Sequence, residues 1–185
     1  MTPRLVLLDR DGVLNVDRPD SVKTPDELIL LPGAAAAVAR LNAAGIKVAL
    51  VSNQSVVGRG VISAQMLQHI QDRLRDVLAR ERARLDFELI CPDPPWAASD
   101  RRKPGAGMLN EAIRRFSLAP YQAVMVGDAL SDLQAAAKAG CGRILVRTGK
   151  GAATQAAGIG AELLPVAVCA DLGDAVARLL DGDTR

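Results

Sequence analysis

Residues 5–12 read LVLLDRDG, an apolar run that ends abruptly in Asp9, Arg10, Asp11 and Gly12. A continuous apolar run of this length is typical of a strand that is covered on both faces, as in a parallel sheet. Open α/β sheets bind their ligands beyond the carboxyl ends of the strands. We therefore expect this first strand to present Asp9 and Asp11 at a functional edge of a sheet.

The same kind of run recurs along the chain and alternates with helical patterns. The further expected strands are residues 46–51, 87–91, 123–126 and 144–146, with a weaker candidate at 166–169. The expected helices are residues 33–44, a long helix capped by Ser63, a helix introduced by Pro104, and residues 131–139 and 172–180. This order predicts a doubly wound parallel α/β sheet in a single domain, residues 1–185.

Composition excludes several classes of partner. A formal net charge of +2 is too small to indicate binding to nucleic acid or to a membrane surface. Cys91, Cys141 and Cys169 are widely spaced and odd in number, which favours a reducing compartment over a disulfide framework. The first apolar run, residues 5–8, is far too short for a signal peptide or a membrane span, so we expect a cytoplasmic protein. No long amphipathic stripe is left over once the sheet is covered, and we expect a monomer.

Asp9 and Asp11 have the chemistry of a nucleophile and its acid–base partner. Side chains at positions i and i+2 leave a strand on the same face, so the two carboxylates can address one site. An ionised carboxylate can attack phosphorus, and a neighbouring carboxylic acid can protonate the departing alkoxide. Taken alone, however, such a pair is more often a solvated turn with capping aspartates.

Two further segments carry groups that suit a phosphoryl site. Ser52, Asn53 and Gln54 follow the second strand, where a hydroxyl and exposed backbone N–H groups can cradle phosphoryl oxygens. Lys103 offers a compact cation, and Pro104 would start the next helix. Each segment by itself also fits a polar surface loop.

Asp128 and Asp132 come after the fourth strand, in the sequence GDALSD. Carboxylate oxygens near a strand end are natural ligands for Mg²⁺. The alternative is that both residues only cap a turn and a helix N-terminus.

Together the four segments resemble the motifs of the haloacid dehalogenase (HAD) superfamily of phosphatases: DxDG, a Ser or Thr after the second strand, a Lys, and GDxxxD. The resemblance implies that Asp9 forms an aspartyl-phosphate and that Asp11 is the general acid and base. Ser52 and Lys103 would orient and stabilise the phosphoryl group. Mg²⁺ would be held by Asp9, the backbone carbonyl of Asp11 and Asp128, with Asp132 in support.

Many members of this superfamily carry a cap domain that selects the substrate. Between Asp11 and Ser52 the sequence provides one loop, one helix and one strand. Between Ser52 and Lys103 it provides one long helix, one strand and one loop. We therefore expect a protein without a cap, whose specificity comes from loops.

Longer stretches look similar to one subgroup, the heptose 1,7-bisphosphate 7-phosphatases and the related histidinol-phosphate phosphatases. They include DRDGVLN at residues 9–15, SNQS at 52–55, RKP at 102–104 and LVRTG at 145–149. By this resemblance Arg102 would contact the substrate away from the scissile phosphate. The remaining substrate-binding residues would be Asp17, Asp20, Asn53, Gln54 and Ser55.

The sequence departs from that subgroup at its structural zinc site. Where the heptose enzymes commonly have Cys-x-His and Cys-x-Cys, this chain has Cys91, Asp93, Ser99 and Arg101. A single soft ligand cannot hold a tetrahedral Zn²⁺, so we expect no zinc. We expect the loop to be stiffened by prolines and anchored by burial of Trp96.

The leading hypothesis is a Mg²⁺-dependent phosphatase that removes the 7-phosphate of the heptose bisphosphate. Histidinol-phosphate phosphatase is the nearest rival, because Asp17 and Asp20 suit the ammonium group of that substrate. A nucleic-acid 3′-phosphatase is disfavoured by the scarcity of aromatic residues and the lack of a broad basic surface. From another class, a receiver-like signalling module also uses aspartates, a Ser or Thr and a Lys around Mg²⁺, but lacks the DxDG pattern.

Overall fold

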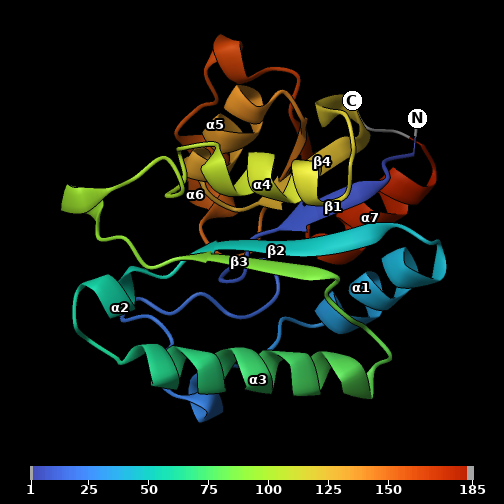
Figure 1. Cartoon of the computed structure of the whole chain (residues 1–185). Coiled ribbons are helices and arrows are strands. Elements are labelled where there is room, and N and C mark those ends of the chain that lie inside the picture. Colours follow the sequence, from blue (N-terminus) through green and yellow to red (C-terminus); the bar gives the residue numbers. More distant parts are fainter. Residues whose placement is uncertain (1, 183–185) are drawn as a thin grey trace.

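The computed structural model describes residues 2–182, which form an α/β domain around a six-stranded parallel sheet (Figure 1). The predicted range of 1–185 also includes residue 1 and residues 183–185, which lie outside the described residues. The strand order is β3-β2-β1-β4-β5-β6. The bounds are β1 Leu5–Leu8, β2 Lys47–Asn53, β3 Phe87–Cys91, β4 Ala123–Gly127, β5 Gly142–Val146 and β6 Ala167–Cys169.

The direction of winding reverses at the centre of the sheet. From β1 the chain moves outward through β2 to β3, and it then returns to β4 on the other side of β1. Such a reversal leaves a crevice beyond the carboxyl ends of the two central strands, where doubly wound folds bind their ligands. The predicted fold class is confirmed, and the functional edge lies at the ends of β1 and β4.

Helices cover both faces of the sheet. Their bounds are α1 Ala34–Ala43, α2 Ser55–Gly58, α3 Ala64–Arg80, α4 Gly107–Arg115, α5 Leu130–Ala139, α6 Gly151–Ala156 and α7 Leu172–Leu180, with 3-10 turns η1 Pro25–Glu27, η2 Pro95–Ala97, η3 Pro120–Gln122 and η4 Ala161–Leu163. Figure 1 shows α1 and α3 on one face of the sheet and α4 and α5 on the other. Val6 and Leu8 pack with α1, α3 and α7, whereas Leu5 and Leu7 pack with α4 and α5. Alternate residues of β1 are therefore buried on opposite faces, which explains its continuous apolar run. Within residues 2–182, no helix is long and apolar enough to cross a bilayer.

The predicted helix ends are confirmed in several places. The side chain of Ser63 accepts a hydrogen bond from the backbone N–H of Met66 at 3.0 Å and so caps α3. Gly45 and Gly140 follow α1 and α5 with positive φ angles of 73° and 72°, a conformation that glycine adopts without strain.

One expectation about the helices is wrong, and two short helices lie where none was predicted. Pro104 does not introduce α4, which begins at Gly107, because the chain first turns around Asp100 and the N–H of Gly107 donates to the Asp100 carbonyl. The short helices α2 and α6 were not expected at all. Each covers six residues or fewer, too few for a helical apolar repeat to show in the sequence.

The loop between β3 and α4 is also held differently from the prediction. Trp96 is 75% exposed and anchors nothing by burial. Instead, the carboxylate of Asp93 accepts hydrogen bonds from both the N–H and the hydroxyl of Ser99, and Arg102 donates to the Asp93 carbonyl. Polar bonds across the loop therefore take the place of a buried aromatic anchor.

Candidate active site

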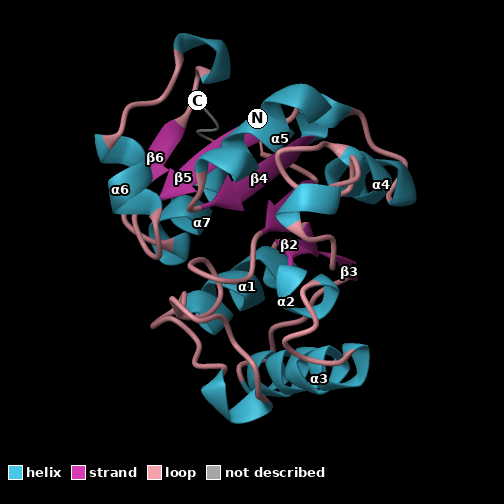
Figure 2. Ribbon diagram, turned by 90° about the vertical axis from the view of Figure 1, so that its left-hand side faces the viewer, coloured by secondary structure: helices cyan, strands magenta, loops and turns pink. Residues whose placement is uncertain are grey.

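A cavity of about 310 Å³ opens beyond the ends of β1, β2 and β4. Figure 2 faces the end of the sheet where α2 lies, and the loops that follow the strands surround this region. The residues that line the cavity are Asp9, Asp11, Asp17, Arg18, Pro19, Ser21, Asn53, Gln54, Ser55, Val56, Arg102, Lys103, Asp128, Ala129, Ser131 and Lys150. Segments from distant parts of the sequence thus meet where the topology predicts a site.

At the base of the cavity Lys103 bridges two aspartates. Its ammonium nitrogen lies 3.0 Å from Oδ1 of Asp9 and 2.6 Å from Oδ1 of Asp132. Burial would lower the pKa of Lys103, but the two carboxylates outweigh it and raise that pKa above the ordinary value. Burial also raises the pKa of Asp9, to about 6, against the opposing influence of Lys103. A permanent positive charge therefore sits beside the proposed nucleophile.

Asn53 holds the backbone of Lys103 in place. Its amide nitrogen donates to the Lys103 carbonyl at 2.9 Å, and its Oδ1 accepts from the Lys103 N–H at 3.1 Å. From the other side, Lys138 on α5 donates to the carbonyl of Pro104 at 2.9 Å. The side chain of Asn53 is engaged with the protein itself, and its predicted substrate contact stays a prediction.

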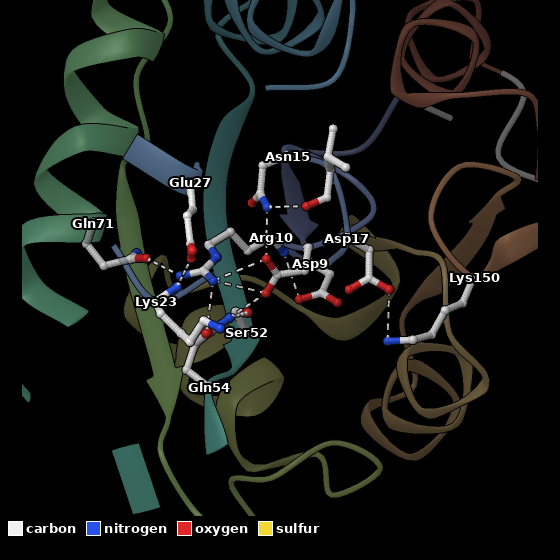
Figure 3. A network of polar contacts seen from close by, with 12 residues as sticks. Asp9, Arg10, Asn15, Asp17, Lys23, Glu27, Ser52, Gln54, Gln71 and Lys150 are labelled. Atoms are coloured by element: carbon white, nitrogen blue, oxygen red, sulfur yellow. Dashed lines mark hydrogen bonds and ion pairs between the residues drawn. The ribbon is translucent and has the colours of Figure 1, made fainter. Parts of the chain in front are cut away.

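The carboxylate of Asp11 is held by three side chains. Arg10 donates to both oxygens at 3.1 Å, Asn15 donates to Oδ1 at 2.8 Å and Gln54 donates to Oδ2 at 2.7 Å. The three donor residues are labelled in Figure 3. Burial by itself would raise the pKa of Asp11, but the Arg10 charge and the amide hydrogen bonds outweigh it and lower that pKa. Asp11 is thus oriented and ionised. Gln54 also donates to the buried hydroxyl of Ser52 at 3.0 Å.

The carboxylates at this edge of the sheet fit a magnesium ion. Asp9, Asp128 and Asp132 each have a ligand atom that lies within 4.8 Å of the others. Oxygen atoms are the ligands that Mg²⁺ prefers. Burial, followed by the charge of Asp9, raises the pKa of Asp128 to about 7, so a cation there would relieve a real repulsion. Asp132 already bonds Lys103 and the N–H of Ala129, in agreement with a supporting role.

The loop after β5 and helix α6 hold Asp128 in place. The N–H of Lys150 donates to Oδ2 of Asp128 at 2.7 Å, and the hydroxyl of Thr154 donates to the Asp128 carbonyl at 2.9 Å. The hydroxyl of Thr148 donates to the carbonyl of Gly12 at 2.6 Å. This loop therefore ties the candidate metal ligand to the loop that carries Asp9 and Asp11.

Several known proteins are similar to this chain in sequence and fold. A family model described as HAD-hydrolase-like matches residues 100–175. The D-glycero-beta-D-manno-heptose-1,7-bisphosphate 7-phosphatase of Bordetella bronchiseptica is 42% identical over 179 residues, which cover 96% of this chain and 98% of that protein. The protein of that name in Pseudomonas aeruginosa is 39% identical over 154 residues, which cover 83% and 86%.

The chain belongs to the HAD-like hydrolases. Within them it is a phosphatase. The crystal structure of D,D-heptose 1.7-bisphosphate phosphatase from B. bronchiseptica complexed with magnesium and phosphate has a TM-score of 0.92 and 40% identity, and the match covers 97% of this chain and 99% of that one. The receiver-like alternative is not supported by this membership.

The structure of this HAD-like phosphatase places most of the predicted substrate-binding residues at the cavity and one of them, Asp20, away from it. Asp17, Ser55 and Arg102 line the cavity, and Asp17 pairs with the ammonium of Lys150 at 3.1 Å. Asp20 is exposed, does not line the cavity and is bonded to Lys23. Its role in substrate binding stays a prediction.

The sequence interpretation missed Arg10, which is fully buried although it lies between the two motif aspartates. It lies two residues beyond the end of β1, and its guanidinium donates to Asp11, Gln54 and Gln71. A charged residue so close to the end of a fully buried strand must find polar partners, and that signal could have marked it.

Proposed function

We propose that this HAD-like phosphatase is a Mg²⁺-dependent phosphomonoesterase that removes the 7-phosphate of D-glycero-D-manno-heptose 1,7-bisphosphate through an aspartyl-phosphate. One observation carries the proposal: Asp9 lies beside the buried cation of Lys103, close to Asp128, and faces the cavity. A carboxylate nucleophile, a neutralising cation and a metal ligand are the groups that phosphoryl transfer needs at one point.

The proposed reaction has two steps. A carboxylate oxygen of Asp9 attacks phosphorus, the ester P–O bond breaks, and Asp11 gives a proton to the departing sugar oxygen. Asp11 then removes a proton from water, which attacks the acyl phosphate and releases inorganic phosphate with free Asp9. Because Asp11 is ionised without substrate, it must take up a proton as the phosphoryl group arrives.

Mg²⁺, held by Asp9 and Asp128 and by the carbonyl of Asp11, would supply positive charge against the phosphoryl oxygens. The protein contributes the charge of Lys103 and a fixed orientation of the acid. The hydroxyl of Ser52 is buried beside Gln54, and we place it next to the phosphoryl group.

The second phosphate of the substrate would meet the basic rim of the cavity. Arg18, Arg102 and Lys150 line it in addition to Lys103. We propose that these loops select the substrate directly, because residues 2–182 form the α/β domain and include no cap domain. Asp17 is already paired with Lys150, which leaves it less available to the ammonium of histidinol phosphate.

Steady-state kinetics on three substrates tests the proposal: both anomers of the heptose bisphosphate and histidinol phosphate, each with Mg²⁺. We expect kcat/KM to be highest for a heptose bisphosphate anomer. A clear preference for histidinol phosphate would overturn the choice of substrate.

Asp9→Asn tests the nucleophile under the same conditions. The folded variant should lose turnover of every phosphoester, since an uncharged amide cannot form the acyl phosphate. Retained turnover in a variant with wild-type circular dichroism would exclude Asp9 as the nucleophile.

A further inference from the structure

Arg10 is the largest fully buried side chain of the described residues, and it is charged. One terminal nitrogen donates to both carboxylate oxygens of Asp11 at 3.1 Å and to Oε1 of Gln54 at 2.9 Å. The other terminal nitrogen donates to Oε1 of Gln71 at 3.0 Å (Figure 3). A buried guanidinium is costly unless such partners surround it, so the site is built around this charge.

The contacts extend from the catalytic edge to helix α3. Gln71 lies on α3, and its amide nitrogen donates to Glu88 on β3 at 3.1 Å. Arg75, also on α3, donates to the same carboxylate. Arg10 therefore makes two sets of contacts. The first set holds the carboxylate of Asp11, and the second, through Gln71, contributes to the attachment of α3 to the sheet.

The orientation of the Asp11 carboxylate depends on the contacts of Arg10 with Asp11 and Gln54. Asn15 holds Oδ1 of this carboxylate and Gln54 holds Oδ2, whereas Arg10 contacts both oxygens and so opposes rotation about χ2 directly. Gln54, which also holds Asp11, is itself held by Arg10 through its Oε1. Removal of Arg10 would thus loosen two of the three side chains that fix the acid.

We infer that Arg10 is a positioning residue for the reaction: it fixes the carboxylate of Asp11 in the orientation from which the departing oxygen is protonated. The inference rests on the proposed function, in which Asp11 is the general acid. The competing interpretation is that Arg10 only attaches α3 to the sheet through Gln71.

The dependence on the leaving group separates the two interpretations. A sugar phosphate releases an alkoxide that must be protonated, whereas p-nitrophenyl phosphate releases a stable phenolate. Loss of acid orientation therefore penalises the first substrate far more than the second. We use kcat/KM, because it reports the steps up to formation of the aspartyl-phosphate and is independent of its later hydrolysis.

The decisive variant is Arg10→Met, with Gln71→Leu as the matched control. For Arg10→Met we expect kcat/KM to fall about 100-fold on the heptose bisphosphate and less than about 10-fold on p-nitrophenyl phosphate, since general acid catalysis contributes about 10²–10⁴-fold. Gln71→Leu removes the contact to α3 and leaves Arg10 beside Asp11. It should lower the melting temperature and leave the ratio of the two kcat/KM values as in the wild type.

The inference would be overturned if Arg10→Met lowered kcat/KM equally on both substrates. It would also be overturned if Gln71→Leu changed the ratio of the two kcat/KM values as much as Arg10→Met does. If Arg10→Met does not fold, Arg10→Lys keeps the positive charge but not the planar fork, and its ratio must shift in the same direction. A wild type that cleaves p-nitrophenyl phosphate and another alkyl phosphate but not the heptose bisphosphate refutes only the proposed substrate. The ratio is then measured with that alkyl phosphate.

Discussion

The side chain of Asn53 holds the backbone of Lys103: its Oδ1 accepts a hydrogen bond from the Lys103 N–H, and its amide nitrogen donates to the Lys103 carbonyl. The ammonium of the same lysine lies 3.0 Å from Oδ1 of Asp9. The lysine reaches the site from a loop, whereas Asn53 is the last residue of β2. The side-chain amide thus transfers the rigidity of the sheet to a catalytic group on a loop. Sites supported in this way keep the geometry that phosphoryl transfer requires.

We predict that Asn53→Ala lowers kcat/KM by roughly 10- to 100-fold. Two hydrogen bonds, each worth about 1 kcal/mol, are lost, and the lysine is no longer held at its backbone. Steady-state kinetics and thermal unfolding of the same preparation measure the two effects.

The chain offers a matched control in Asn42, which makes the same pair of bonds to the backbone of Arg84, at 2.8 and 3.2 Å. Asn42 does not line the cavity. Asn42→Ala should therefore lose stability and keep its activity. Equal activity in the two variants would refute a special role for the Asn53 contact.

Gly149 provides a second test, because its backbone packs against the candidate metal site. A Cβ at this position would lie 2.1 Å from Oδ2 of Asp128 and 2.6 Å from the Cα of Gly12. We expect Gly149→Ala to displace Asp128 and to raise the Mg²⁺ concentration for half-maximal activity at least about 10-fold. Titration of activity with MgCl₂ measures this.

Gly45→Ala is the control for backbone strain. Gly45 also has a positive φ, of 73°, but a Cβ there meets no atom within 4 Å. The variant should lose about 1 kcal/mol of stability from the left-handed conformation and keep the Mg²⁺ dependence of the wild type. If Gly149→Ala, like Gly45→Ala, keeps the Mg²⁺ dependence of the wild type, the close packing of Gly149 against Asp128 does not affect Mg²⁺ binding.

The sheet and the motif residues could be predicted from the sequence because both depend on local patterns. Apolar runs predicted the six strands, and the motif order predicted that Asp9, Lys103 and Asp128 line one cavity. Ser52 is buried beside Gln54 and does not line that cavity, so its predicted role stays a prediction. Contacts between residues far apart in the sequence leave no local pattern, so the hydrogen bonds from the Asn53 side chain to the Lys103 backbone could not be predicted. Neither could the exposure of Trp96, since the hydrogen bonds of Asp93 hold its loop instead.

The raised pKa values of Asp9 and Asp128 predict how the metal-free protein responds to pH. Burial is the first cause in both cases, and the folded pKa values of about 6 and about 7 lie above the ordinary 3.8. The protonated forms are therefore favoured by folding. Their contribution to the free energy of unfolding is fully present below about pH 4 and is lost as the pH rises through 6 and 7.

Between about pH 5 and about pH 8 the loss should be on the order of 4 kcal/mol, because about one unit of the pKa shift of Asp9 and about two units of that of Asp128 fall in this range, and one unit corresponds to about 1.4 kcal/mol. In EDTA the melting temperature should thus be lower at about pH 8 than at about pH 5, by roughly 10 °C. Excess MgCl₂ should restore stability at the higher pH and have little effect at the lower one, where protons compete for the carboxylates. A Mg²⁺ effect that is equal at both pH values would contradict this account of the cluster.

The hydrogen bonds between Asp93 and Ser99 should matter for substrate binding through Arg102. Ser99→Ala removes the hydroxyl bond to Asp93, whose carbonyl receives the guanidinium of Arg102 at 2.8 Å. Because Asn53 holds Lys103 independently, we expect KM for the sugar bisphosphate to rise about 3- to 10-fold with kcat nearly unchanged, a pattern that reports lost binding alone. Ser63→Ala is the control: it loses the N-cap of α3, about 1 kcal/mol of stability, and leaves KM unchanged. A fall in kcat without a change in KM would show that the loop positions Lys103 instead of Arg102.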